Sequence, residues 1–165
     1  MKVVAIVQAR MGSTRLPSKV MKEIGGVPMI ELLLARLSRA KEVDQIVVAT
    51  SVDEKNGFLA THVEELGYLC VRGSENDVLQ RYLDAAYASK ADIVVRVTGD
   101  CPLIDPTLVD EVVARFKREQ VDYLANNLPP TYSRGSSTFR PSPTLRCEYR
   151  SASRTPRRTI APWLP

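Results

Sequence analysis

The chain has 165 residues, 44% of them hydrophobic and 25% charged, which fits one globular domain with a substantial core. No apolar run approaches the roughly 20 residues of a membrane helix, and the N-terminal run meets Gln8 and Arg10 too soon for a signal peptide, so we expect a cytoplasmic protein without a membrane partner. The net charge of +4 comes from residues 136–165, which hold six Arg and one acid and leave 17 basic and 18 acidic residues in 1–135; the near-neutral body gives no reason to expect a nucleic-acid partner.

Short apolar runs predict five β-strands. In chain order these are VVAIV (3–7), QIVVAT (45–50), YLCV (68–71), DIVVRV (92–97) and DYLA (122–125). The first, second and fourth are apolar nearly throughout, which is typical of strands that are covered on both faces.

Helical patterns separate these strands. We expect helices from Pro28 through residue 40, over about 54–66, from Ser74 onward and from Asp105-Pro106 onward. The inward residues expected in the last two are Val78, Leu79, Tyr82, Leu83 and Ala86, and then Leu108, Val109, Val112, Val113 and Phe116. This alternation predicts an α/β sandwich with a mainly parallel sheet and helices on both faces. Ligands of such sheets bind beyond the carboxyl ends of the strands.

The composition changes after Gly135. Residues 136–165 are rich in Pro, Ser, Thr and Arg and show neither a helical nor a strand period. We therefore divide the chain into a folded domain, 1–135, and an irregular basic tail, 136–165.

The stretch VQARMGSTRLPSK (7–19) follows the first strand and carries three cations, Arg10, Arg15 and Lys19. Backbone amides at a strand end, with Gly12 allowing close approach, form a concavity that suits anions, and Arg binds phosphate oxygens two at a time. The stretch therefore predicts a polyphosphate site, although it matches neither GxxxxGK[ST] nor GxGxxG. The alternative is a solvated basic loop.

Two further loops follow strands. In RVTGDCPLID (96–105), Asp100 suits Mg²⁺, which needs only one or two protein carboxylates beside substrate phosphates; the alternative is that Asp100 caps a turn. In RGSENDVLQRY (72–82), Ser74 and Asp77 read as helix-start signals, and Arg81 faces either the same cleft or the surface.

The order and spacing of VQARMGSTRLPSKV, IVVATS, VRGSENDVLQRY and VVRVTGDCPLIDP resemble the spore-coat polysaccharide synthesis protein F family over residues 1–135. That family is a branch of the cytidylyltransferases that make CMP-activated acidic sugars, such as the acylneuraminate and Kdo enzymes. The resemblance implies a Rossmann-like nucleotide-diphospho-sugar transferase fold, Mg²⁺ as cofactor with Asp100 as its ligand, and Arg10 and Lys19 as catalytic cations. The nucleotide-binding residues that it implies are Ala9, Arg10, Gly12, Ser13, Arg15, Lys19, Ser74 and Arg81.

The implied reaction joins CTP and a sugar acid into a CMP-sugar for surface polysaccharide and releases pyrophosphate. The resemblance stops after PPTYSRG (129–135), where the family continues with an LDVEVF-like acidic segment and this chain continues with SSTFRPSP. A frameshift and a truncated, divergent terminus both explain this departure, and each leaves activity open. Two alternatives therefore stand: a nucleotide-binding module without catalysis, and a transferase of the same fold that uses another nucleotide. The resemblance also allows a homodimer.

Overall fold

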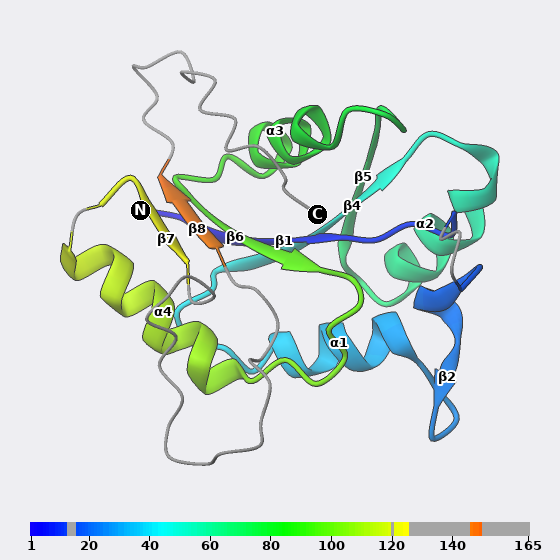
Figure 1. The fold of residues 1–165 in the computed structure, drawn as a ribbon, viewed down its shortest axis with the longest axis horizontal. Coiled ribbons are helices and arrows are strands. Elements are labelled where there is room, and N and C mark those ends of the chain that lie inside the picture. The colour runs from blue at the N-terminus through cyan, green and yellow to red at the C-terminus, as the bar shows by residue number, and fades with distance from the viewer. Residues whose placement is uncertain (13–15, 120, 126–145, 150–165) are drawn as a thin grey trace.

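The structure is a computed structural model that describes residues 1–12, 16–119, 121–125 and, for the backbone, 146–149. Its centre is a six-stranded sheet in the order β5-β4-β1-β6-β8-β7 (Figure 1). The strands are β1 (Val3–Gln8), β4 (Gln45–Ser51), β5 (Leu69–Gly73), β6 (Ile93–Thr98), β7 (Tyr123–Ala125) and β8 (Arg146–Tyr149). The neighbours β5, β4, β1 and β6 are parallel, and β8 pairs antiparallel with β6 and β7. The predicted α/β fold class with a mainly parallel sheet is thus confirmed.

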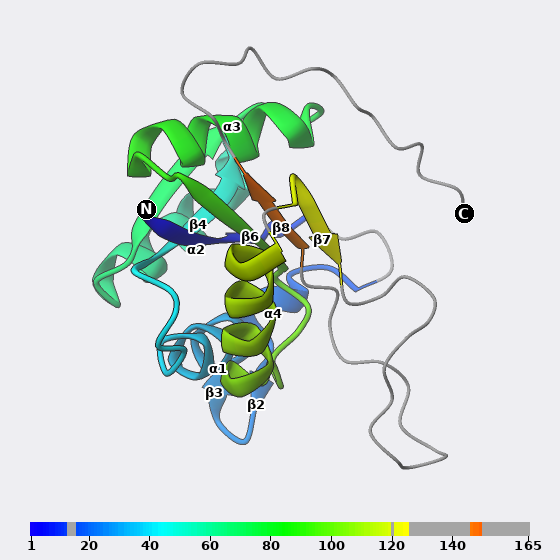
Figure 2. The same ribbon diagram turned by 90° about the vertical axis from the view of Figure 1, so that its left-hand side faces the viewer.

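Four α-helices connect the strands. They are α1 (Met29–Leu37), α2 (Gly57–Glu65), α3 (Val78–Ser89) and α4 (Pro106–Glu119), and two short 3-10 helices, η1 (Lys19–Met21) and η2 (Glu54–Asn56), precede α1 and α2. Figure 2 shows α3 on one face of the sheet and α1 and α4 on the other. No helix in the described part of the chain is long and apolar enough to cross a membrane.

The two faces of the sheet bury two cores of unequal size, because successive side chains of a strand point to opposite faces. The larger core lies on the side of α1, α2 and α4 and includes Val3, Ala5, Val7, Val48, Val95, Leu33, Leu59 and Phe116. The smaller core lies under α3 and includes Val4, Ile6, Val47, Val94, Tyr82 and Ala85. Both faces of β1 are covered, as its unbroken apolar sequence predicts.

Three predictions of local structure were wrong. Helix α3 begins at Val78 rather than Ser74, because Asp77 is its N-cap and accepts a hydrogen bond from the Gln80 N–H at 2.9 Å. Leu79 is 52% exposed instead of facing inward. The four residues of β8 form a strand inside the segment expected to be irregular, because the edge of β6 offers backbone groups that pair with any extended segment. The rest of 136–165 lies outside the described residues, so the division at Gly135 stays a prediction.

A short hairpin, β2 (Glu23–Ile24) and β3 (Val27–Pro28), was not predicted. Gly25 and Gly26 connect its strands with φ of 62° and 83°. Two consecutive residues at positive φ match the type I′ turn, which favours glycine at both positions. The Gly-Gly pair was therefore the signal in the sequence.

Candidate functional site

The carboxyl ends of β1, β4, β5 and β6 lie at one edge of the sheet, because these strands are parallel. Gln8, the last residue of β1, is in register with Thr98 of β6 on one side and with Ala49 of β4 on the other. The loops that follow β1 and β6 therefore leave the sheet side by side, and the loop that follows β5 lies on the far side of β4.

The loop after β6 approaches the end of β1 very closely at Gly99. Its N–H donates to the Gln8 carbonyl oxygen at 2.7 Å. A Cβ at this position would lie 2.8 Å from that oxygen and 3.0 Å from the Cβ of Ala9. Only glycine fits without displacement of backbone, and this close approach brings the next residue, Asp100, to the first loop.

Lys19 and Asp100 form an ion pair between these two loops, with 3.1 Å from Nζ to Oδ2. Burial raises the pKa of Asp100, but hydrogen bonds from Thr98 and Lys19, the charge of Lys19 and the residue's own N–H outweigh it. The pKa of Asp100 therefore lies below its ordinary value of 3.8. Asp100 is thus a charged, half-exposed carboxylate at neutral pH, which is the state that a hard divalent cation requires.

Asp100 alone is a suitable ligand for the Mg²⁺ ion that the sequence implies, but it does not complete the ion's coordination. The described residues contain no cluster of three or more His, Cys, Asp or Glu side chains that could hold a metal. A single carboxylate fits Mg²⁺ when substrate phosphates supply further oxygens. The neighbouring Cys101 Sγ lies 3.1 Å from Thr98 Oγ1 and 3.7 Å from Asp100 Oδ1.

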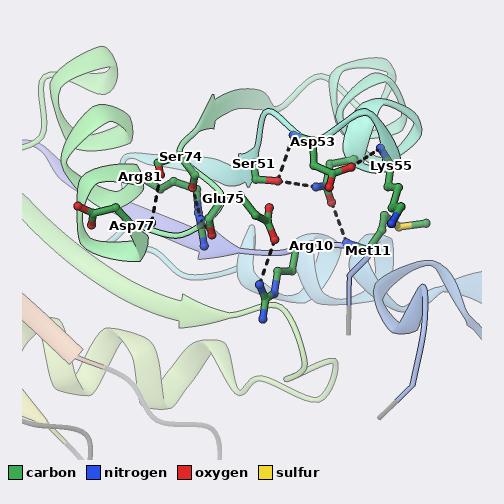
Figure 3. A network of polar contacts seen from close by, with 10 residues as sticks. Arg10, Met11, Ser51, Asp53, Lys55, Ser74, Glu75, Asp77 and Arg81 are labelled. Carbon is green, nitrogen blue, oxygen red and sulfur yellow. Dashed lines mark hydrogen bonds and ion pairs between the residues drawn. The ribbon is translucent and has the colours of Figure 1, made fainter. Parts of the chain in front are cut away.

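Arg10 meets a different acid, Glu75, on the loop between β5 and α3. Its Nη1 lies 3.1 Å from Glu75 Oε1, and Figure 3 shows the two side chains meeting across the edge of the sheet. Glu75 had no role in the sequence predictions, because only the fold brings residues 10 and 75 together. Both described cations of the first loop are therefore paired with acids.

Arg81 lies beneath this loop and is only 2% exposed. Its Nη1 donates to the carbonyl oxygens of Ser74 and Glu75, with 2.8 Å to the latter. The Ser74 hydroxyl accepts from the Asp77 N–H at 3.1 Å, although the helix begins only at Val78. Arg81 is thus buried and holds the loop that carries Glu75.

The backbone amides of the first loop are less free than the sequence suggested. The Ala9 N–H donates to the Ala49 carbonyl oxygen at 3.2 Å, and the Met11 N–H donates to Asn56 Oδ1 at 2.8 Å. Gly12 has open space around its Cβ position among the described residues, so its predicted role in binding nucleotide stays a prediction. Ser13 and Arg15, which were also predicted to bind nucleotide, lie outside the described residues.

Comparison with known proteins gives the chain a family and a set of relatives. A family model described as cytidylyltransferase matches residues 4–148. The chain is 37% identical to the spore coat polysaccharide biosynthesis protein SpsF of Bacillus subtilis over 125 residues, 73% of this chain and 52% of SpsF. It is also 37% identical to the 3-deoxy-manno-octulosonate cytidylyltransferase of Geobacter sulfurreducens over 117 residues, 69% of this chain and 45% of that enzyme.

A solved structure agrees with these relatives. The structure of a cytidylyltransferase from Leptospira borgpetersenii superposes with a TM-score of 0.79 at 37% identity, over 90% of this chain and 60% of that one. The chain spans about half the length of the curated relatives that it matches.

Proposed function

The chain belongs to the cytidylyltransferase family, and we propose that it binds CTP with a divalent metal at the carboxyl ends of β1 and β6 and transfers CMP to an acidic sugar. The observation that carries the proposal is the ion pair between Lys19 and Asp100, 3.1 Å long, across two neighbouring loops. It joins a cation suited to phosphate and a carboxylate suited to a metal within one site. The relatives named for spore-coat polysaccharide and for 3-deoxy-manno-octulosonate support a sugar acid as the acceptor.

In the proposed reaction, a hydroxyl oxygen of the sugar acid attacks the α-phosphorus of CTP. The bond from that phosphorus to the bridging oxygen breaks, pyrophosphate leaves, and the hydroxyl proton passes to solvent. Lys19 and Arg10 bind the phosphate oxygens and neutralise the charge that builds on the leaving pyrophosphate. We propose that Asp100 would hold a Mg²⁺ ion, which when bound supplies positive charge to the phosphate oxygens.

Binding rearranges both ion pairs. Arg10 and Lys19 release Glu75 and Asp100 in part, because a triphosphate offers more negative charge than one carboxylate. These pairs are partly exposed, with Arg10 at 48% and Lys19 at 33% side-chain exposure. Exposed ion pairs contribute roughly 0–1 kcal/mol, so their exchange costs little compared with the binding of a triphosphate.

The second candidate is a nucleotide-binding module without turnover. Residues 136–165 carry one acid, Glu148, where the family is expected to continue with an acidic segment. We propose a cytoplasmic location for either function. A homodimer also stays a prediction.

A thermal-shift comparison of CTP, UTP, ATP and GTP, each with Mg²⁺ and with EDTA, tests nucleotide binding. CTP at about 100 times its dissociation constant should stabilise the fold by roughly 2.7 kcal/mol, and Lys19→Ala and Arg10→Ala should each reduce this gain. Lys117→Ala is the matched control, because Lys117 on α4 also forms an ion pair with an acid, Glu42, at 2.8 Å. If CTP raises the melting temperature of both loop variants as much as that of the parent, the proposed phosphate site is wrong. Pyrophosphate release with a panel of sugar acids then separates the enzyme from the binding module.

A further inference from the structure

Asn56 has a buried polar side chain whose place in the fold calls for a functional explanation. It ends η2 and is only 2% exposed. Buried amides are uncommon and need hydrogen-bond partners. The hydrogen-bond partners of Asn56 lie on two different segments, after β1 and at the end of β4, at the edge of the sheet that carries the candidate site.

The Asn56 amide bridges these two segments. Its Oδ1 accepts from the Met11 N–H at 2.8 Å, and its Nδ2 donates to Ser51 Oγ at 2.6 Å. Figure 3 shows Met11 and Ser51 on either side of this bridge. The backbone N–H of Met11 is a donor only, so the oxygen of the amide must face it and the nitrogen must face Ser51. The orientation of the Asn56 side chain is therefore fixed by its partners.

The far end of the bridge is rigid. Ser51 is fully buried at the end of β4, and its Oγ also accepts from the Asp53 N–H at 3.3 Å. Arg72 donates to the carbonyl oxygens of Ser51, Val52 and Asp53. The sheet and Arg72 thus hold the segment from which Asn56 reaches the first loop.

The near end of the bridge controls the loop proposed to bind phosphate. The Met11 N–H belongs to the peptide plane that joins Arg10 to Met11, so Asn56 fixes the direction in which the backbone leaves Arg10. The Met11 carbonyl oxygen accepts from the Ser18 N–H at 3.0 Å, and the chain therefore returns to Met11 just before Lys19. Met11, which Asn56 holds, therefore connects the backbone at Arg10 with the backbone next to Lys19.

We propose that Asn56 is a positioning residue for the nucleotide phosphates. It touches no substrate; it orients the Arg10–Met11 peptide and thereby the backbone on which Arg10 and Lys19 stand. This inference rests on the proposed function, since it assumes that the loop after β1 binds the triphosphate of CTP.

The test compares Asn56→Ala with Asp53→Ala in the full chain. Asp53 is the matched control, because it caps the same η2 by accepting from the Lys55 N–H at 2.9 Å and makes no described contact with residues 9–19. Titration calorimetry measures the affinity for Mg²⁺–CTP and for inorganic tripolyphosphate. We expect Asn56→Ala to weaken both ligands about tenfold, which is about 1.4 kcal/mol, and Asp53→Ala to change neither by more than about twofold. Amide hydrogen exchange at Met11 should accelerate in Asn56→Ala alone.

The outcomes separate the two proposals. If the unaltered chain binds neither ligand, the proposed function fails and this inference falls with it. If the unaltered chain binds and Asn56→Ala binds equally well, or loses no more than Asp53→Ala, only the inference is overturned. Should Asn56→Ala not fold, Ser51→Ala releases the other end of the amide. It should weaken tripolyphosphate and speed Met11 exchange, and unchanged values would overturn the inference.

Discussion

The two acids that meet the first loop come from regions of different construction. Asp100 follows Gly99, whose backbone is hydrogen-bonded directly to the end of β1 at 2.7 Å. Glu75 stands on a loop that a side chain, Arg81, holds from below. One acid is thus positioned by the backbone of the sheet, and we call its loop the rigid region; the other is positioned by the hydrogen bonds of one buried side chain, and we call its loop the adjustable region. We infer that the rigid region suits a metal ligand, and that the adjustable region suits a counter-ion that gives way to substrate.

The largest effect should come from the acid of the rigid region. Asp100→Asn keeps the shape of the side chain and removes its charge. We expect it to abolish the Mg²⁺ dependence of CTP binding and to lower any turnover by about 100-fold or more, as losses of electrostatic groups in active sites do. Calorimetry with and without EDTA measures the first effect, and the melting temperature should hardly move. A large fall in melting temperature in Asp100→Ala but not in Asp100→Asn, whose side-chain oxygen can still cap, would instead support the alternative that Asp100 caps a turn.

The rigidity of that region depends on Gly99 and can be broken there. Gly99→Ala places a Cβ 2.8 Å from the Gln8 carbonyl oxygen and 3.2 Å from the Cα of Ala9, and backbone atoms cannot rotate away. We expect a loss of about 1–3 kcal/mol in the free energy of unfolding, measured in urea. Gly12→Ala is the control, because no atom of the described residues lies within 4 Å of its Cβ position. Equal stability of the two variants would contradict the close approach.

The sequence predicted the rigid region better than the adjustable one, for a physical reason. Asp100 and Lys19 both follow strands, and the carboxyl ends of parallel strands share one edge, so the fold class predicts that both lie near that edge, as Glu75 also does, but not which side chains pair there. Local chemistry also pointed to Asp77 and Asp105 as helix-start signals, and each accepts a nearby N–H in the structure, although α3 was predicted to start at Ser74 rather than at Val78. Such contacts join residues two or three apart, so they can be predicted from the sequence.

The other contacts depend on which side chains meet at that edge, and the sequence carries no signal for the pairing itself. Glu75 reaches Arg10 across 65 residues of sequence, and Asn56 reaches Met11 across 45. The sequence left Arg81 open between cleft and surface, and the structure gives it a third place, buried beneath a loop. A long cationic side chain can satisfy backbone carbonyls inside the fold as well as bind substrate, and residue type alone does not separate the two.

The adjustable region gives a prediction of opposite sign. Glu75→Gln removes the charge that Arg10 must leave when it binds phosphate, while the amide oxygen still accepts a hydrogen bond. We expect CTP affinity to rise by about two- to fivefold, because an exposed pair contributes at most about 1 kcal/mol. Titration calorimetry should compare the Mg²⁺–CTP affinity of Glu75→Gln with that of Asp100→Asn, which should be lower than in the parent. Weaker binding by Glu75→Gln would mean that Glu75 positions Arg10 for the ligand rather than competing with it.

The smallest effect concerns acid stability and again separates the two regions. The pKa of Asp100 in the folded chain lies below 3.8, so its ion pair stabilises the fold above that pH and the contribution disappears as pH falls through the lower, folded value. Urea unfolding from about pH 5 downward should show the parent losing its advantage over Asp100→Asn only below about pH 3.8. The difference should be at most about 1 kcal/mol, since the pair is partly exposed, and salt should reduce it. Lys19→Met, which removes the ion-pair partner and leaves the hydrogen bond from Thr98, should reduce that pH dependence, because Lys19 supplies both a hydrogen bond and a charge to Asp100. An unchanged profile in Lys19→Met would show that Thr98 and the backbone N–H alone hold the Asp100 carboxylate in its charged form.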